Sequence, residues 1–66
     1  MSEKVEFEGA VCIAQTKQAI CVRLADRDEM VWIPQSQVDD DSEVYQAGDK
    51  GTLVVSEWIA MQKGLI

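Results

Sequence analysis

The stretch Ala19–Pro34, AICVRLADRDEMVWIP, constrains the fold more than any other part of the chain. Two short apolar runs, both rich in strand-forming residues, flank four polar residues, and this pattern is typical of a β-hairpin. A turn centred on Arg27 and Asp28 fixes which residues face each other across the two strands. The predicted pairs are Leu24 with Val31, Arg23 with Trp32, and Val22 with Ile33.

Side chains alternate between the two sides of a strand, so this register sorts the hairpin into two faces. The uniformly aliphatic face, which we predict to be the core face, carries Ile20, Val22, Leu24, Val31 and Ile33. The opposite face carries Cys21, Arg23, Ala25, Met30 and Trp32. A shift of one residue would mix Trp32 and Met30 with the aliphatic set, so the pattern specifies which face is buried.

The run Val5–Ala14 extends the hairpin into a three-stranded meander. A turn centred on Thr16 and Lys17 predicts further facing pairs, which are Ile13 with Ile20, Cys12 with Cys21, and Val11 with Val22. The residues that join the core face in this register are Phe7, Val11 and Ile13. Gly9, in the middle of the run, predicts a bulge or a bend.

The two cysteines leave two alternatives open. Because Cys12 is predicted to face Cys21, a cross-strand disulfide is geometrically conceivable. The other reading is a pair of small apolar side chains, which stay thiols in a reducing cytosol. We favour the free thiols, because the charged N-terminus MSEKVEFEG has no apolar core of the kind found in signal peptides.

The segment Gln35–Gly48 shows no regular apolar period and is predicted to be an ordered loop with a helical turn near Ser36. Its isolated apolar residues, Val38 and Val44, are expected to plug the open edge of the sheet. The acidic residues of this loop are expected to be solvated; they are Asp39, Asp40, Asp41 and Glu43.

A strand and a helix follow the loop. Gly48–Gly51 predicts a turn, Thr52–Val55 a fourth strand, and Ser56 is a good N-cap for a helix over Glu57–Lys63. The side chains expected to close the bottom of the core are Trp58, Ile59 and Leu65, and residues 1–4 are expected to be a frayed terminus. The predicted fold is mainly β: one domain over residues 1–66, a small, strongly bent antiparallel barrel of the SH3-like or OB-like type, with about four strands and a short C-terminal helix.

The net charge of the chain narrows the range of binding partners. The 66 residues carry 12 acidic and 6 basic side chains, a net charge of −6. Nucleic-acid affinity rests on neutralising phosphates with lysine and arginine, so the balance disfavours nucleic acid, and by the same reasoning anionic membranes. It favours basic protein partners. No run approaches the roughly 20 apolar residues of a membrane span, and we expect a cytoplasmic protein.

Catalytic and metal-binding signals are weak. The chain has no histidine, the commonest general base, and neither cysteine has a histidine partner. The run DDDSE lacks the spacing of a calcium loop, and no cysteine or histidine spacing suits zinc. We therefore expect no enzyme activity, no cofactor and no metal.

The candidate interface residues are aromatic, basic or sulfur-containing side chains outside the predicted core. They are Arg23, Met30, Trp32, Tyr45 and Trp58. Trp32 has three readings: the C-terminal helix covers it and Trp58 packs on it, a second copy covers it in a homodimer, or a foreign partner does. The composition around it is that of an interface hot spot.

The second half of the chain resembles a family of short uncharacterised proteins encoded by bacteriophages and prophages. The shared motifs are VWIPQSQV, DDSEV and GDKGTLVVSEWIAMQKGL in this order, and they span Val31–Leu65, about half of the chain. The resemblance implies a setting, a small accessory protein made in an infected or lysogenic bacterial cell. It brings no activity and no site residues.

Three functions remain. The first, which we favour, is a non-enzymatic acidic module that binds a host protein, as an inhibitor or a nucleic-acid mimic. The second is a barrel that binds single-stranded nucleic acid, with Trp32 and Tyr45 as stacking platforms beside Arg23 and Lys17. The third is a binder of a small ligand such as a nucleotide, held between Trp32 and Trp58 at a subunit boundary. Clustering of the cations on one face would favour the second.

Overall fold

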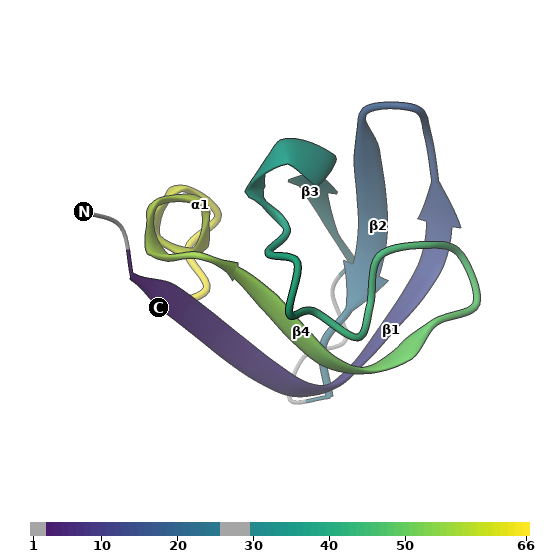
Figure 1. Cartoon of the computed structure of the whole chain (residues 1–66), viewed down its shortest axis with the longest axis horizontal. Coiled ribbons are helices and arrows are strands. Elements are labelled where there is room, and N and C mark those ends of the chain that lie inside the picture. Colours follow the sequence, from purple (N-terminus) through teal and green to yellow (C-terminus); the bar gives the residue numbers. More distant parts are fainter. Residues whose placement is uncertain (1–2, 26–29) are drawn as a thin grey trace.

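A four-stranded antiparallel sheet and one short helix make up the computed structural model, which describes residues 3–25 and 30–66 (Figure 1). The sheet order is β3-β2-β1-β4. The elements are β1 (Lys4–Gln15), β2 (Ala19–Arg23), β3 (Met30–Pro34), the 3-10 turn η1 (Gln35–Gln37), β4 (Lys50–Ser56) and α1 (Glu57–Gln62). The predicted turn at Arg27 and Asp28 lies outside the described residues.

The sheet bends strongly along the long strand β1, which β4 follows on one side, with α1 at the far end (Figure 1). The predicted class is confirmed: the protein is mainly β, with antiparallel strands and a short C-terminal helix. Among the described strands, β3 and β4 form the two edges and do not pair with each other. The barrel is therefore an open one.

The β2–β3 hairpin has the predicted core face but a different register. Ile20, Val22 and Ile33 are fully buried, and Val31 packs against them. The observed pairs are Ile20 with Ile33, Cys21 with Trp32, Val22 with Val31, and Arg23 with Met30. The predicted pairing of Arg23 with Trp32 is wrong, but the register differs by two residues, and a shift by an even number leaves every side chain on its predicted face.

The β1 strand corrects the prediction for two residues. A register shift between Phe7 and Ala10 marks a bulge at the predicted position of Gly9. The extra residue reverses the alternation of side chains, because two residues then oppose one on the partner strand. Phe7 contacts the core before the bulge, and Ala10 and Cys12 are buried after it. Val11 and Ile13, predicted to lie in the core, are instead exposed on the outer face.

Residue 9 must be glycine for two reasons. Its φ of 73° lies in the left-handed region, which side chains disfavour. A Cβ atom at this position would also lie 2.9 Å from the Cβ atom of Ala25. The close approach of Ala25 to the bulge thus depends on the missing side chain.

The two cysteines do not face each other. Cys12 is paired with Val22, and Cys21 with Ala14, because the register of β1 against β2 shifts again between Cys12 and Ala14. Both are free and buried. Burial raises the pKa of the Cys12 thiol, which donates a hydrogen bond to the carbonyl oxygen of Ala14 at 3.2 Å. The free thiols predicted from the sequence are thus present, in a different arrangement.

The chain ends close the core. The Ser56 hydroxyl accepts a hydrogen bond from the backbone N–H of Ile59 at 3.3 Å, which confirms the predicted N-cap of α1. The residues that this segment buries are Ile59, Ala60 and Leu65. Trp58, predicted to join them, is 56% exposed. The predicted fraying does not extend to residues 3 and 4, because β1 begins at Lys4 and the carbonyl oxygen of Glu3 accepts from the N–H of Glu57 at 2.8 Å.

Candidate functional site

The loop after η1 runs along the outer edge of β4. Val38 forms a bridge with Val55, and the N–H of Asp39 donates to the carbonyl oxygen of Val54 at 2.8 Å. Val44 is fully buried. The prediction that Val38 and Val44 plug an edge of the sheet is confirmed, and the edge is that of β4.

Ser42 holds this loop in place from inside. Ser42 is buried, although it lies in the sequence between acidic residues that were predicted to be solvated. Its hydroxyl donates to the carbonyl oxygen of Val44 at 2.9 Å and accepts from the N–H groups of Val44 and Val54 at 3.2 and 3.1 Å. Its role depends on contacts with β4, so no local sequence signal marks it.

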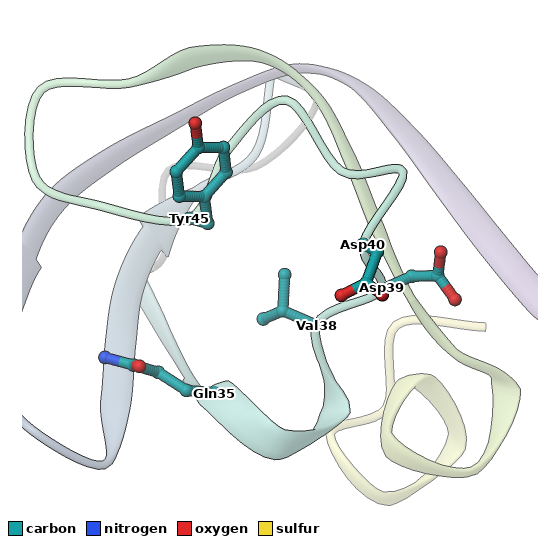
Figure 2. Close-up of a pocket in the computed structure, with 5 residues that line it drawn as sticks. All are labelled: Gln35, Val38, Asp39, Asp40 and Tyr45. Carbon is teal, nitrogen blue, oxygen red and sulfur yellow. The ribbon is translucent and has the colours of Figure 1, made fainter.

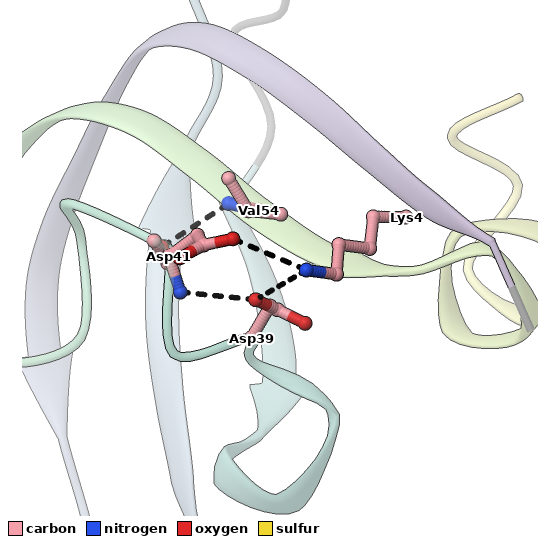
Figure 3. A network of polar contacts seen from close by, with 5 residues as sticks. Lys4, Asp39, Asp41 and Val54 are labelled. Carbon is pink, nitrogen blue, oxygen red and sulfur yellow. Dashed lines mark hydrogen bonds and ion pairs between the residues drawn. The ribbon is translucent and has the colours of Figure 1, made fainter.

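Lys4 fastens the acidic loop to β1 from outside (Figure 3). Its Nζ lies 3.3 Å from Asp39 Oδ1 and 3.1 Å from Asp41 Oδ2. Asp39 Oδ1 also accepts from the backbone N–H of Asp41 at 2.9 Å. That backbone hydrogen bond, and then the Lys4 ammonium, hold the pKa of Asp39 below its ordinary value. The two carboxylates raise the pKa of Lys4.

Asp39→Asn is expected to weaken the dependence of stability on acid pH. The folded-state pKa of Asp39 is lowered, so its contribution is complete above the ordinary carboxyl pKa of about 4 and is lost as the pH falls through the lower folded value. Asparagine keeps an oxygen for the N–H of Asp41 but removes the charge. Urea unfolding at a series of acid pH values measures this.

Asp40→Asn is the matched control, because Asp40 makes no ion pair or hydrogen bond with any residue of the described chain. Its curve should keep the wild-type slope in acid. An Asp39→Asn curve that falls as steeply as the wild type would contradict the assigned role of the charge.

A pocket of about 420 Å³ opens beside this loop (Figure 2). Its lining residues are Gln35, Val38, Asp39, Asp40 and Tyr45. Val38 lies between the tyrosine ring and the two carboxylates in Figure 2. Tyr45 is 57% exposed, and Asp40 has no partner among the described residues. An aromatic ring and an unpaired carboxylate around an apolar floor together suit a cationic side chain.

The walls of this pocket are held by other parts of the chain. The backbone N–H groups of Tyr45 and Gln46 donate to Asp49 Oδ2 at 3.2 and 3.1 Å. The side-chain amide of Gln35 donates to the carbonyl oxygen of Thr16 at 2.8 Å. Two of the predicted site groups, Tyr45 and the acidic loop, therefore meet in one hollow.

A second surface covers the outer face of β1, β2 and β3. The predicted residues Arg23, Met30 and Trp32 lie there, with Arg23 opposite Met30. Val11 and Ile13, which the sequence placed in the core, extend this face on β1. Since an exposed apolar patch on rigid strands is typical of an interface, this outer face is a candidate contact surface.

Two basic residues, Arg23 and Lys50, lie on the outer face of the sheet, because both are paired with Val11. Lys63, the residue that follows α1, lines a hollow with Trp32, and Trp58 is not among the residues that line it. Trp58 is exposed on α1 and belongs neither to the Tyr45 pocket nor to the outer face of the sheet.

Among the described residues, no three histidine, cysteine or acidic side chains are placed to hold a metal ion. No helix in the described part of the chain has the length and apolar character to cross a membrane. Comparisons with protein-family models, with curated proteins and with solved structures find no match to this chain.

Proposed function

We propose that the protein is a non-enzymatic binding module that holds a basic side chain of a partner protein in the Tyr45 pocket. The observation that carries this proposal is that one hollow is lined by Tyr45 and by Asp40, whose carboxylate has no partner among the described residues. A lysine or arginine would place its charge between the face of the Tyr45 ring and the Asp40 carboxylate, with its stem against Val38. The net charge of −6 would steer basic partners toward the protein.

The same contacts argue for a single basic side chain over a mimic of the phosphate backbone. Asp39 and Asp41 are paired with Lys4, and Glu43 Oε1 accepts from the N–H of Thr52 at 2.9 Å. These three carboxylates serve the fold. Of the four acidic residues of the loop, Asp40 is the one whose carboxylate has no described partner. In the infected or lysogenic cell that the phage resemblance implies, the partner would be a host protein.

Asp40→Asn and Tyr45→Ala are expected to weaken binding of an arginine- and lysine-rich peptide by about two- to fivefold each, since exposed ion pairs and cation–π contacts contribute up to about 1 kcal/mol. Titration calorimetry at low and physiological salt measures the affinities. A single-stranded oligonucleotide, tested in parallel, is expected not to bind, although Arg23, Lys50 and Trp32 share the outer side of the sheet.

Two variants control for charge and for aromatic surface. Glu8→Gln removes an exposed carboxylate outside the pocket, and Trp58→Ala removes an aromatic side chain of nearly the same exposure as Tyr45. Both should bind the peptide as the wild type does. Equal losses in all four variants, or no peptide binding by the wild type, would contradict the proposal. Tight oligonucleotide binding would support the nucleic-acid reading instead.

A further inference from the structure

The two edge strands of the sheet, β3 and β4, differ in whether their outward backbone groups have hydrogen-bond partners. At the β4 edge, every outward backbone group of Thr52 and Val54 has a partner. The N–H and carbonyl of Thr52 bond to the side chain and backbone of Glu43, at 2.9 Å each. The N–H of Val54 bonds to Ser42 Oγ at 3.1 Å, and its carbonyl to the N–H of Asp39 at 2.8 Å. The loop thus closes this edge.

No described residue forms hydrogen bonds of this kind with the β3 edge. The N–H of Gln35 donates to the carbonyl oxygen of Gln18 at 2.8 Å. This bond shows which residues of β3 direct their backbone groups toward β2 and which direct them outward. Because inward and outward backbone groups alternate in an antiparallel pair, Val31 and Ile33 direct theirs to β2. The backbone N–H and carbonyl groups of Met30 and Trp32 point outward, away from β2. No described residue forms a hydrogen bond with these backbone groups. An open edge is a template for another strand.

We infer that β3 of a second copy pairs with this edge, antiparallel and centred on Trp32. In this register Trp32 lies opposite Trp32 of the other copy, and Met30 opposite Pro34. A two-fold axis through the centre brings outward backbone groups onto outward backbone groups. Pro34 has no N–H, so the pair of Met30 with Pro34 forms one bond, from the Met30 N–H to the Pro34 carbonyl oxygen, and the ladder ends there in each copy.

Two features favour a second copy over a foreign strand. The edge is self-complementary about Trp32, and on the outer face the pairing covers Trp32 and Met30, which are large apolar side chains exposed in one copy. The acidic loop does not compete for this edge, because its backbone groups bond to β4 and none of them bonds to Met30 or Trp32. This inference does not rest on the proposed function, because the Tyr45 pocket contains no residue of β3.

Amide hydrogen exchange of the wild type tests the pairing without any substitution. Between two protein concentrations about a hundredfold apart, the Trp32 and Met30 amides should exchange about tenfold more slowly at the higher one. The Ile33 amide, already bonded to β2, should not change. Native mass spectrometry at the same concentrations should show the mass doubling. A monomeric mass at both protein concentrations, or an exchange rate of the Trp32 amide that does not change between them, would overturn the inference.

A pair of variants separates edge pairing from packing of the outer faces. Trp32→Lys and Ile13→Lys each place a lysine at a residue that is 46% exposed, the first on the edge strand and the second on the inner strand β1. Trp32→Lys should be monomeric at both concentrations, and Ile13→Lys should dimerise as the wild type does. Loss of the dimer in both variants would show that the faces pack together and would overturn the edge pairing. Peptide binding in the Tyr45 pocket should be unchanged in Trp32→Lys, so the two proposals can fail separately.

Discussion

Val22→Asp is expected to unfold the protein. Val22 is fully buried in the middle of β2, between Cys12 of β1 and Val31 of β3. An unpaired carboxylate at this site costs several kcal/mol. A domain of this size has a total stability of roughly 3–5 kcal/mol, so little or none would remain. Far-UV circular dichroism and urea unfolding measure the loss.

Ile13→Asp is the informative control for this substitution. Simple alternation along the first strand places Ile13 in the core, whereas the bulges of β1 turn it to the outer face. We expect a change of less than about 1 kcal/mol, as is usual for exposed sites. A folded Val22→Asp protein beside an unfolded Ile13→Asp protein would reverse the assignment of the faces.

Ser42→Ala is expected to lower the free energy of unfolding by about 2–4 kcal/mol, because each buried donor left without a partner costs about 1–3 kcal/mol. The substitution removes the acceptor for the N–H groups of Val44 and Val54, and nothing else in the described chain replaces it. Urea unfolding at neutral pH measures this. The exposed Ser36, changed to alanine in the same way, should have an effect within about 0.5 kcal/mol. A Ser42→Ala protein as stable as the Ser36→Ala protein would show that water replaces the hydroxyl.

The two faces of the hairpin could be predicted because side chains alternate along a strand, so a register that is wrong by two residues still assigns each side chain to the correct face. The true pairing, Val22 with Val31, differs from the predicted one, Val22 with Ile33, by two positions. Both registers bury the same side chains, so the apolar pattern cannot separate them. The length of the turn decides between them, and its sequence carries no strong turn signal.

The face of β1 could not be predicted by the same reasoning. Residues 10–14, AVCIA, are apolar throughout, so they contain no alternation to read. Gly9 correctly indicated a bulge, but its effect on the phase of the strand follows only from the pairing of Phe7 with Leu53 and of Ala10 with Gly51. Those partners lie more than forty residues further along the chain.

The candidate site, like the fold, could be predicted only in part from the sequence. Tyr45 and the acidic residues stand out by their chemistry, and the structure brings them together at one pocket. Lys4 and Ser42 do not stand out, because their roles come from segments that meet only in the folded protein. Trp58 was misplaced because a short helix has room for one buried stripe, and Ile59 and Ala60 occupy it.

The order of the strands has a consequence for synthesis on the ribosome. The β2–β3 hairpin is local in sequence, so it can form as soon as it emerges. The acidic loop cannot adopt its folded position at that stage, because its hydrogen-bond partners, Thr52 and Val54, are synthesised after it. The N-terminal part of β1 waits even longer, since Val5 pairs with Val55. The apolar face of the nascent hairpin therefore stays without its partners until β4 leaves the exit tunnel, and exposed apolar surface of this kind is prone to aggregation.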